Sequence, residues 1–471
     1  MKRPVLSIAL LSALIINTII FQVQFNNLVF ANKIIPILIN SLLFIILIGS
    51  LYIIYKLIWK DVRFKKSMII VSILLNIFLL IINFSTNIFD KMMSKITSDE
   101  VIYTSTIIVR NDSSINSIDD LNNKKIGISD NESDYENNVL AYEYLSKNNK
   151  VDNNTFYKYN DYLLALNDLL NGNIDALIIS NDYQSIYSEY FNSLSDSFKR
   201  IINPLSKSIK KVKDIKHDLN DSFTVLIIGA DGQGGSTYNA DVLILMTINP
   251  NTKNVVMVDV VRDTYAYNLG NSKMDKITHS GWYGNENVVA TVANLFDINI
   301  DYYIKFNFQS VVELVDLIGG VNINVPYKYP VKMNGKNYYI QPGQRTLNGL
   351  ETLALARTRK EIGSSLFTRG EMQMTIIEEV IKQTDGMFLL KNFFKFSSIL
   401  ENNIKTNIKK EDLYYYIQKY ISIKGDLTFS HNRLMGADSS YYHTGMKSNL
   451  YTYIPNVDSL NQLKALLKNN L

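Results

Sequence analysis

The sequence predicts a membrane-anchored α/β protein, and three observations support that fold class. Three long apolar stretches lie within about the first 90 residues of a 471-residue chain. Short alternating strands and amphipathic helices follow, which is typical of a small α/β domain. From Phe223 onward, buried strands alternate with helical segments, which predicts a second and larger α/β domain. A chain of this length has room for two or three domains.

The composition argues against several classes of protein. A net charge of +4 is slight for this length and predicts no nucleic-acid partner. The chain has no cysteine, so disulfides and thiolate metal sites are excluded, which fits an exported protein. Closely spaced histidines are absent from the sequence, which argues against a zinc enzyme; the four histidines are His217, His279, His431 and His443.

The N-terminal region, residues 1–90, is predicted to hold three transmembrane helices. The apolar stretches Pro4 to Phe21, Ile34 to Leu57 and Met68 to Phe89 each approach the roughly 20 residues that span a bilayer. A cleaved signal peptide would account for the first stretch alone, but two further spans follow it. Basic residues precede the first span and cluster between the second and third: Lys2, Arg3, Lys56, Lys60, Arg63, Lys65 and Lys66. The positive-inside rule therefore predicts a multi-pass protein of the cell membrane, with a cytoplasmic N-terminus and an extracellular remainder.

Residues 98–200 are predicted to form an extracellular accessory domain. The stretch STIIVRNDSSINSIDDLNNKKIGISDN predicts a strand, a turn, a short helix and a strand. The stretch DYLLALNDLLNGNIDALIISND predicts an amphipathic helix that stops at Gly172 before a buried strand. DLNNKKIGI and LLNGNIDALI resemble a lobe of a periplasmic solute-binding protein. A ligand-binding domain and a spacer without a ligand both fit this resemblance.

Residues 201–221 are predicted to form a basic linker. The segment has little apolar content and carries a run of lysines: Lys207, Lys210, Lys211, Lys213 and Lys216. This composition favours a solvated linker helix over a segment that attracts an acidic wall polymer.

Charged residues gather at predicted strand ends in the last predicted domain, residues 222–471. A buried strand, Phe223 to Ala230, ends at Asp231, and the next strand starts at Asp241. Two carboxylates across one loop can share a hard cation through their oxygens. A third strand ends at Arg262 and Asp263, and an arginine there indicates an anion. The glycines after Asp231 do not form a nucleotide motif, because no Lys-Ser/Thr follows them.

The densest basic cluster lies just before a predicted helix. It consists of Arg357, Arg359, Lys360 and Arg369. Guanidinium groups suit an anion with several oxygens because each offers a flat fork of donors. Thr368 and Glu371 have capping-box spacing, which places Arg369 and Gln373 on one helical face near amides that attract phosphate. Taken alone, this stretch is more typical of a solvated charged loop.

Seven motifs, in order, resemble the LytR–CpsA–Psr family of cell-wall glycopolymer ligases. They are IGAD, DVLILMTINPNTKNVVMVDVVRDTY, KITHSGWYG, DINIDYYIKFNF, VDLIGGVNINVPY, QPGQRTLNGLETLALARTRK and TRGEMQ. The resemblance spans about residues 222–383 and continues more weakly towards Leu471. The three spans and the accessory domain resemble the capsule-associated branch. The resemblance implies an α/β/α sandwich around a mixed sheet, with an apolar pocket for a polyprenyl chain.

The resemblance also implies an activity and a set of site residues. Family members are phosphotransferases that move a glycopolymer, such as teichoic acid or capsule, from a polyprenyl-pyrophosphate carrier to the muramic acid 6-hydroxyl of peptidoglycan. Asp231 and Asp241 match the ligands of Mg²⁺ or Mn²⁺, and together with Arg262 and Arg359 they are the implied catalytic residues. The implied pyrophosphate-binding residues are Arg262, Lys276, Arg357, Arg359, Arg369 and Gln373.

Two positions depart from the family pattern. Asn239 stands where the family usually has arginine, and Leu366 stands where it usually has an acid. If the usual arginine and acid form a salt bridge with each other, the loss of both would leave the site active. If their loss instead weakens pyrophosphate binding, the reaction would be slower. We expect the two side chains to be neighbours, because one base and one acid are missing together.

Three functions are compatible with these residues. The first is the glycopolymer–peptidoglycan ligase. The second is a hydrolase that uses the same pyrophosphate-binding residues with water as the acceptor. The third is a non-catalytic sensor or scaffold that binds lipid-linked polymer. Asp241 and Asp263 are candidates for the general base. His279 suits either contact with the acceptor or a packed interior position.

Overall fold

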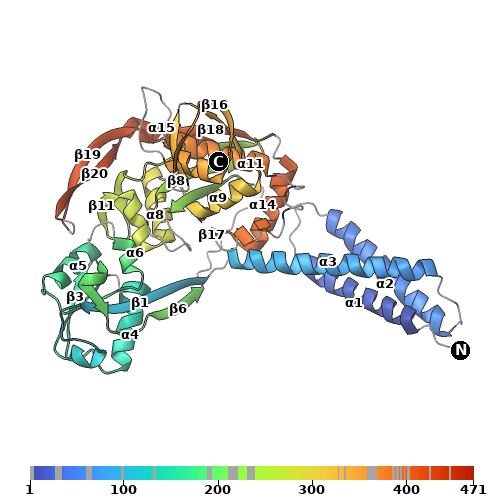
Figure 1. Cartoon of the computed structure of the whole chain (residues 1–471), viewed down its shortest axis with the longest axis horizontal. Helices are drawn as coiled ribbons and strands as arrows, with labels where there is room; N and C mark the ends of the chain where they lie inside the picture. The colour runs from blue at the N-terminus through green and yellow to red at the C-terminus, as the bar shows by residue number, and fades with distance from the viewer. Residues whose placement is uncertain are drawn as a thin grey trace. The chain divides into compact units, whose positions relative to one another are not determined.

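A computed structural model shows the arrangement of the chain (Figure 1). It describes residues 5–26, 34–59, 66–96, 100–130, 134–187, 194–210, 221–230, 239–326, 328–333, 336–357, 369–384, 388, 392, 395–396, 398–399, 404–423, 426–444 and 447–471. The chain divides into two compact units. One consists of Met1–Thr97, Phe393–Glu401 and Ile408–Gly425; the other consists of Ser98–Asn392, Asn402–Asn407 and Asp426–Leu471.

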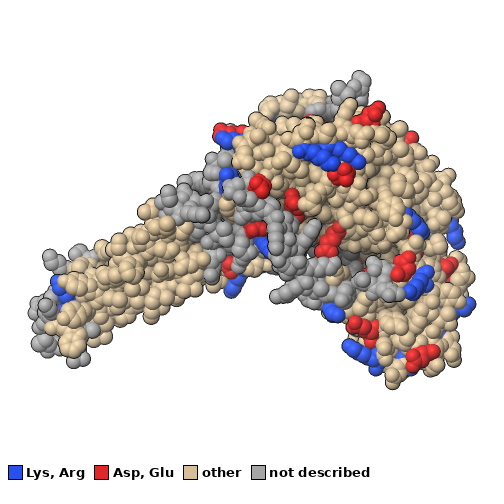
Figure 2. Space-filling model, turned by 180° about the vertical axis from the view of Figure 1, so that it is seen from behind, with Lys and Arg blue, Asp and Glu red and all other residues tan. Residues whose placement is uncertain are grey.

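Among its described residues, the first unit contains three helices that are long and apolar enough to cross a membrane. They are α1 (Val5–Asn26), α2 (Ile34–Trp59) and α3 (Lys66–Ile96), and the unit also includes α14 (Lys410–Ile423). The candidate spans Ser7–Asn26, Pro36–Leu57 and Met68–Ile88 confirm the three stretches expected from the sequence. Figure 2 shows the surface of these helices without charged side chains over most of its length, as a lipid environment requires.

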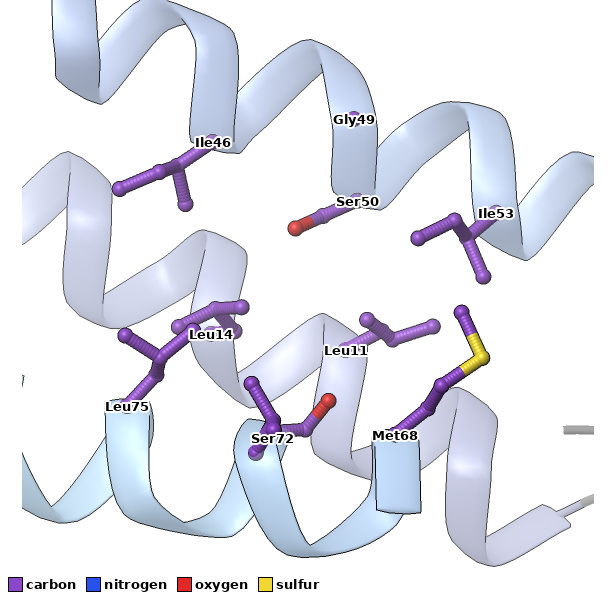
Figure 3. A pocket seen from close by; sticks show the side chains of 10 residues that line it. Leu11, Leu14, Ile46, Gly49, Ser50, Ile53, Met68, Ser72 and Leu75 are labelled. Carbon is purple, nitrogen blue, oxygen red and sulfur yellow. The ribbon is translucent and has the colours of Figure 1, made fainter. Parts of the chain in front are cut away.

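Polar side chains join α1 to α3. Asn17 Nδ2 donates to Asn76 Oδ1 at 2.9 Å, and Asn83 Nδ2 donates to the Asn17 carbonyl at 3.1 Å. Thr86 Oγ1 donates to Gln24 Oε1 at 2.6 Å. Such interhelical bonds help membrane helices associate, because apolar contact alone gives no advantage over lipid. The three helices surround a largely apolar cavity of about 330 Å³. Figure 3 shows side chains that line it, and the full lining is Leu11, Leu14, Ile46, Gly49, Ser50, Ile53, Met68, Val71, Ser72 and Leu75.

The accessory domain has a mixed six-stranded sheet in the order β3-β2-β4-β1-β5, with β6 paired to β1. Its strands are β1 (Glu100–Arg110), β2 (Lys125–Ser129), β3 (Thr155–Tyr159), β4 (Ala176–Ser180), β5 (Phe198–Arg200) and β6 (Leu205–Lys210). Its helices are η1 (Ile118–Leu121), η2 (Tyr135–Val139), α4 (Leu140–Lys147), α5 (Tyr162–Leu170), α6 (Tyr183–Tyr187) and α7 (Leu194–Ser197). The expected stop at Gly172 is confirmed, because its φ of 77° requires the left-handed backbone that glycine adopts readily.

The expectation of a linker helix within residues 201–221 was wrong for its described part. Leu205–Lys210 is strand β6, which pairs antiparallel with β1 from Glu100↔Lys210 to Ser105↔Leu205. Among the described strands β6 pairs only with β1, so it lies at an edge, where lysine side chains are well tolerated. The sheet therefore extends past the expected domain boundary at residue 200.

The larger domain is built on a mixed six-stranded sheet in the order β17-β12-β7-β8-β9-β18. The strands β7 (Phe223–Ala230), β8 (Val242–Asn249) and β9 (Asn254–Asp259) pair antiparallel in sequence, which confirms three expected strands. Parallel pairs join β12 (Tyr302–Asn307) to β7 and β18 (Thr428–Arg433) to β9, and β17 (Ile404–Thr406) pairs antiparallel with β12. Every residue of β7 is buried, as in a strand covered on both faces.

Helices form layers against this sheet. One core gathers alternate strand residues such as Leu226 and Leu245 with Val292 of α8 (Asn285–Phe296) and Leu467 of α15 (Val457–Asn469). The intervening strand residues, such as Ile244, are buried as well. The helices α9 (Phe308–Leu317) and α11 (Arg369–Gln383) contact β12, β9 and β18, and α10 (Gly349–Arg357) packs against both of them. The mixed sheet with its helical layers confirms the fold class.

Short two-stranded ribbons complete the domain. They are β10 (Tyr265–Asn268) with β11 (Lys273–Lys276), β13 (Val321–Val325) with β16 (Gly343–Leu347), β14 (Tyr329–Met333) with β15 (Lys336–Ile340), and β19 (Gly436–His443) with β20 (Ser448–Pro455). The turn η4 (Ile277–Tyr283) follows β11 directly. Two of these ribbons border the residues described next.

Candidate functional site

The strand directions bring Asp241 and Arg262 to one edge of the central sheet. At this edge β7 ends and β8 begins, where the Asp241 N–H donates to the Gly229 carbonyl at 2.9 Å. The next strand, β9, returns to the same edge, where the Val260 N–H donates to the Leu243 carbonyl at 2.9 Å. The side chains of Asp241 and Arg262 meet there as an ion pair, with only 14% and 12% of their surfaces exposed.

A second ion pair lies next to the first along the chain. Lys276 Nζ donates to Asp263 Oδ1 at 2.9 Å. The ribbon of β10 and β11 positions this lysine, because Tyr265 pairs with Lys276. The Thr278 N–H donates to the Arg262 carbonyl at 3.0 Å. Backbone hydrogen bonds thus connect the segment that carries Lys276 to the strand end that carries Arg262.

Two helix ends bring Arg357, Arg369 and Gln373 into one region. Arg357 is exposed at the end of α10, and Arg369 begins α11. Gln373 Nε2 donates to the Ala356 carbonyl at 3.0 Å, which ties α11 to the last turn of α10. The Gln373 amide therefore joins two helices through a backbone carbonyl. The sequence resemblance implied only a role in pyrophosphate binding.

Asp259 supports the start of α11, although no sequence motif marked it as a site residue. A Cβ atom added at Gly370 would lie 1.8 Å from Asp259 Oδ2, so only glycine allows this approach. Burial raises the pKa of Asp259 to about 6, although the positive charges of Arg433 and Arg369 oppose that rise. The available sequence signal was an acid at the end of the apolar strand NVVMVD.

His431 also holds α11 in place. Its Nδ1 lies 2.9 Å from Glu371 Oε1, and its Nε2 lies 2.8 Å from Glu378 Oε2. The hydrogen bond to Glu371 and the negative charges of both glutamates raise the pKa of His431. Strand β18 thereby contacts two successive turns of the helix that carries Arg369 and Gln373.

Several expected site residues lie outside the described part of the chain. These are Asp231, Arg359, Leu366 and Thr368, so their assignments, including the capping box, stay predictions. The helix expected after Thr368 is confirmed as α11. Asp241 fits a magnesium ligand by its chemistry, because it presents a part-buried carboxylate beside a cation suited to phosphate.

Asn239 has a partner that no sequence pattern indicated. Trp282 Nε1 donates to Asn239 Oδ1 at 2.8 Å. The same indole belongs to the hydrophobic core of the accessory domain, where it packs against Tyr187. The position at which the family usually has arginine thus accepts a hydrogen bond from a side chain anchored in the accessory domain. His279 is fully buried and stacks on Trp282, in agreement with a packed interior position.

Comparisons with known proteins agree with the motifs and the fold. Residues 188–469 match the model of the LytR_cpsA_psr family. Residues 93–202 match a model described as ABC transporter, phosphonate, periplasmic substrate-binding protein.

Two relatives are each named polyisoprenyl-teichoic acid–peptidoglycan teichoic acid transferase TagU. The one from Bacillus licheniformis is 34% identical over 288 residues, and the one from Bacillus subtilis is 32% identical over 288 residues. Each alignment covers 60% of this chain and 90% of the relative. A crystal structure of Bacillus subtilis TagU is 32% identical, covers 53% of this chain and 97% of that chain, and has a TM-score of 0.40. Because the family model spans more than half of the sequence, the chain belongs to the LytR_cpsA_psr family.

Proposed function

We propose that this protein is a membrane-anchored transferase that joins a wall glycopolymer to peptidoglycan through a phosphodiester. The observation that supports this most directly is the Asp241–Arg262 pair at one sheet edge, in a chain 34% identical to a named teichoic acid transferase. The proposed donor is a glycopolymer linked to polyprenyl pyrophosphate. The proposed acceptor is the 6-hydroxyl of muramic acid.

Cationic side chains at strand and helix ends would bind the pyrophosphate. Arg262 and Lys276 lie on connected segments at the sheet edge, and Arg357 and Arg369 lie at the facing ends of α10 and α11. Arginine forks can bind two oxygens at once and do not deprotonate. Arg359 belongs to the same group by its sequence position.

Asp241 and Asp231 would hold Mg²⁺ or Mn²⁺, which would supply positive charge to the pyrophosphate oxygens. Asp241 already contacts Arg262, so the carboxylate and the guanidinium restrain each other before the donor binds. Phosphoryl transfer depends mainly on positioning and charge stabilisation, which suits such a preorganised pair.

The proposed reaction forms one bond and breaks one bond at phosphorus. The acceptor hydroxyl oxygen bonds to the phosphorus nearer the sugar, while the anhydride bond to the lipid phosphate breaks. The hydroxyl proton passes to a base or to solvent, and polyprenyl phosphate leaves. Both candidate bases are paired with cations, Asp241 with Arg262 and Asp263 with Lys276. Anhydride cleavage supplies the free energy, because no ATP is available outside the cell.

In the proposed orientation, the N-terminus lies in the cytoplasm and the second compact unit lies outside. The basic residues before the first span and between the second and third spans support this orientation. The natural chain lacks cysteine, so a single introduced cysteine reports the membrane orientation without background labelling. Ser195→Cys should react with a membrane-impermeant thiol reagent on intact cells, whereas Val62→Cys should react only after lysis. The reverse pattern would contradict the orientation.

A reconstituted transfer reaction tests the activity. The full chain in lipid vesicles is mixed with a synthetic polyprenyl-pyrophosphate oligosaccharide, glycan strands and Mg²⁺. Mass spectrometry should find the sugar joined by phosphodiester to muramic acid, together with released polyprenyl phosphate. A free sugar phosphate without glycan attachment would indicate a hydrolase, and binding without release would indicate a scaffold. Either result would refute the proposed transfer.

A further inference from the structure

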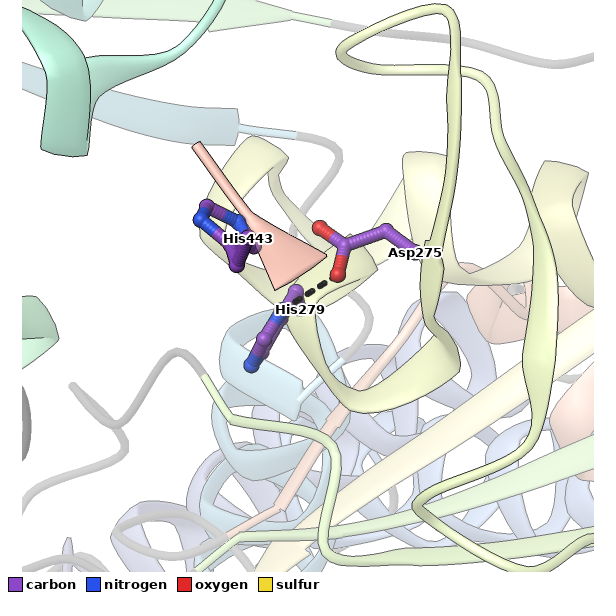
Figure 4. Close-up of side chains that lie close together, drawn as sticks. All are labelled: Asp275, His279 and His443. Atoms are coloured by element: carbon purple, nitrogen blue, oxygen red, sulfur yellow. Dashed lines mark hydrogen bonds and ion pairs between the residues drawn. The ribbon is translucent and has the colours of Figure 1, made fainter. Parts of the chain in front are cut away.

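Three buried side chains that the proposed transfer does not use converge beside the segment that carries Lys276. Asp275 lies on β11, His279 in η4 and His443 at the end of β19, and they are 2%, 0% and 7% exposed. One potential ligand atom from each lies within 4.8 Å of the others. Figure 4 shows the carboxylate and the two imidazole rings facing a common region.

We propose that Asp275, His279 and His443 form a transition-metal site that binds Zn²⁺. One carboxylate and two neutral imidazoles are a donor set that suits zinc, whereas magnesium prefers oxygen ligands alone. Three protein ligands leave one position of a tetrahedral ion for water or another donor. This donor set shares no residue with the proposed magnesium ligands Asp231 and Asp241.

The contacts around these residues are those expected around metal ligands. His279 Nδ1 lies 2.8 Å from Asp275 Oδ1, and the ion would take the place of the proton between them, so that the neutral ring would carry its proton on Nε2 instead. The Lys276 N–H donates to the same carboxylate oxygen at 2.7 Å, and the Tyr441 hydroxyl donates to it as well. The indole of Trp282 stacks on His279 with ring centroids 4.0 Å apart. Contacts of this kind orient a metal's ligands.

The ion would connect two segments that are distant in sequence. His443 and Tyr441 belong to the β19–β20 ribbon, whereas Asp275 precedes Lys276, a residue of the transfer site. The ribbon also approaches that site through its backbone, because the Tyr453 N–H donates to the Asp263 carbonyl at 2.8 Å. Bound Zn²⁺ would therefore stabilise the segment that positions Lys276 without entering the phosphoryl transfer.

Cobalt provides a direct spectroscopic test on the full-length chain. The protein is purified in detergent with a tag that lacks histidine, treated with EDTA, desalted and titrated with Co²⁺. We expect visible d–d bands that saturate at one Co²⁺ per chain and disappear when Zn²⁺ is added. The chain has no cysteine, so thiolate ligands cannot produce these bands. Zn²⁺ should also raise the unfolding midpoint, by about 5 °C at a hundredfold excess over its dissociation constant.

Variants separate this site from other metal binding. His443→Gln and Asp275→Asn should weaken Co²⁺ binding by at least about tenfold. His431→Gln is the matched control, because that histidine pairs with two glutamates elsewhere, and it should keep the bands. Asp241→Asn should also keep them. Equal Co²⁺ binding by His443→Gln and the unchanged chain would overturn the proposal, as would an absence of d–d bands in the unchanged chain at millimolar Co²⁺. The His443→Gln midpoint in EDTA verifies that this variant is folded.

Discussion

Trp282 Nε1 donates a hydrogen bond to Asn239 Oδ1 at 2.8 Å, which links the accessory domain to the loop before Asp241. The indole is 5% exposed and packs edge-on against Tyr187, with ring centroids 5.4 Å apart. Asn239 stands two residues before Asp241, the partner of Arg262. A shift of this indole would therefore act on the segment that positions the proposed metal ligand.

Trp282→Phe tests this link. We expect the transfer rate to fall roughly 2- to 10-fold, because the change removes one hydrogen bond, worth about 0.5–1.5 kcal/mol, and keeps an aromatic ring. Asn239→Ala should have a similar effect, and the double variant should be no slower than either single one, since all three lack the same bond. Tyr183→Phe alters the same core without removing this bond and is the control. Additive effects in the double variant would contradict the coupling.

Restoring the usual family residue at Asn239 should not improve the enzyme. Asn239→Arg removes the acceptor of Trp282, and it adds a cation near Arg262 without a counter-charge, so we expect an unchanged or lower transfer rate. Leu366→Asp alone should also fail to help, because a lone carboxylate repels pyrophosphate. In the double variant, the gain in transition-state stabilisation should exceed the sum of the two single effects by ~0.5–3 kcal/mol, the usual coupling between neighbouring charges. Strict additivity in the transfer assay would refute this expectation.

Arg262→Ala should slow transfer severely. Loss of one preorganised donor to developing charge costs ~2–4 kcal/mol of transition-state stabilisation, or about 30- to 1000-fold in rate. Arg345→Ala is a suitable control, because Arg345 is exposed and donates to backbone carbonyls. Arg262→Lys should recover only part of the rate, since lysine keeps the charge but lacks the planar fork. Equal rates for Arg262→Ala and Arg345→Ala would exclude Arg262 from the site.

His431 should make the folded state less stable as the pH rises. Its pKa is raised in the folded protein by the hydrogen bond to Glu371 and by both glutamate charges. Its stabilising contribution is therefore complete below the ordinary pKa of 6.5 and is lost as the pH rises through the higher folded value. We expect the thermal midpoint of the unchanged chain to fall across this window, and the midpoint of His431→Gln to fall less. Parallel curves for the two proteins would contradict this role.

Gly370→Ala should destabilise the start of α11. The new methyl carbon would lie 1.8 Å from Asp259 Oδ2, and relief requires movement of a buried carboxylate or of the helix. Overpacking of this kind costs about 1–3 kcal/mol. Thr375→Ala on the same helix is the control, and thermal unfolding measures both variants. An unchanged midpoint for Gly370→Ala would show that the approach to Asp259 is easily relieved.

Local sequence patterns were sufficient for the membrane spans and for several strands and helices of the two α/β domains. The apolar stretches identified α1, α2 and α3, and the buried runs identified β7, β8 and β9, because length and side-chain periodicity are local properties. The same reasoning failed at Leu205–Lys210. Its lysines suggested a helix, but pairing with distant β1 decided the conformation, and strand preference depends strongly on such context.

The sequence by itself determined the membrane spans, several of the strands and helices, the family motifs and the identity of the charged residues. Only the tertiary structure decided which of these residues meet: Asp241 with Arg262, Asn239 with Trp282, and Asp275 with His279 and His443. These contacts depend on strand direction, register and packing between segments far apart in the chain. Such relationships have no local periodicity, so spacing along the sequence did not reveal them.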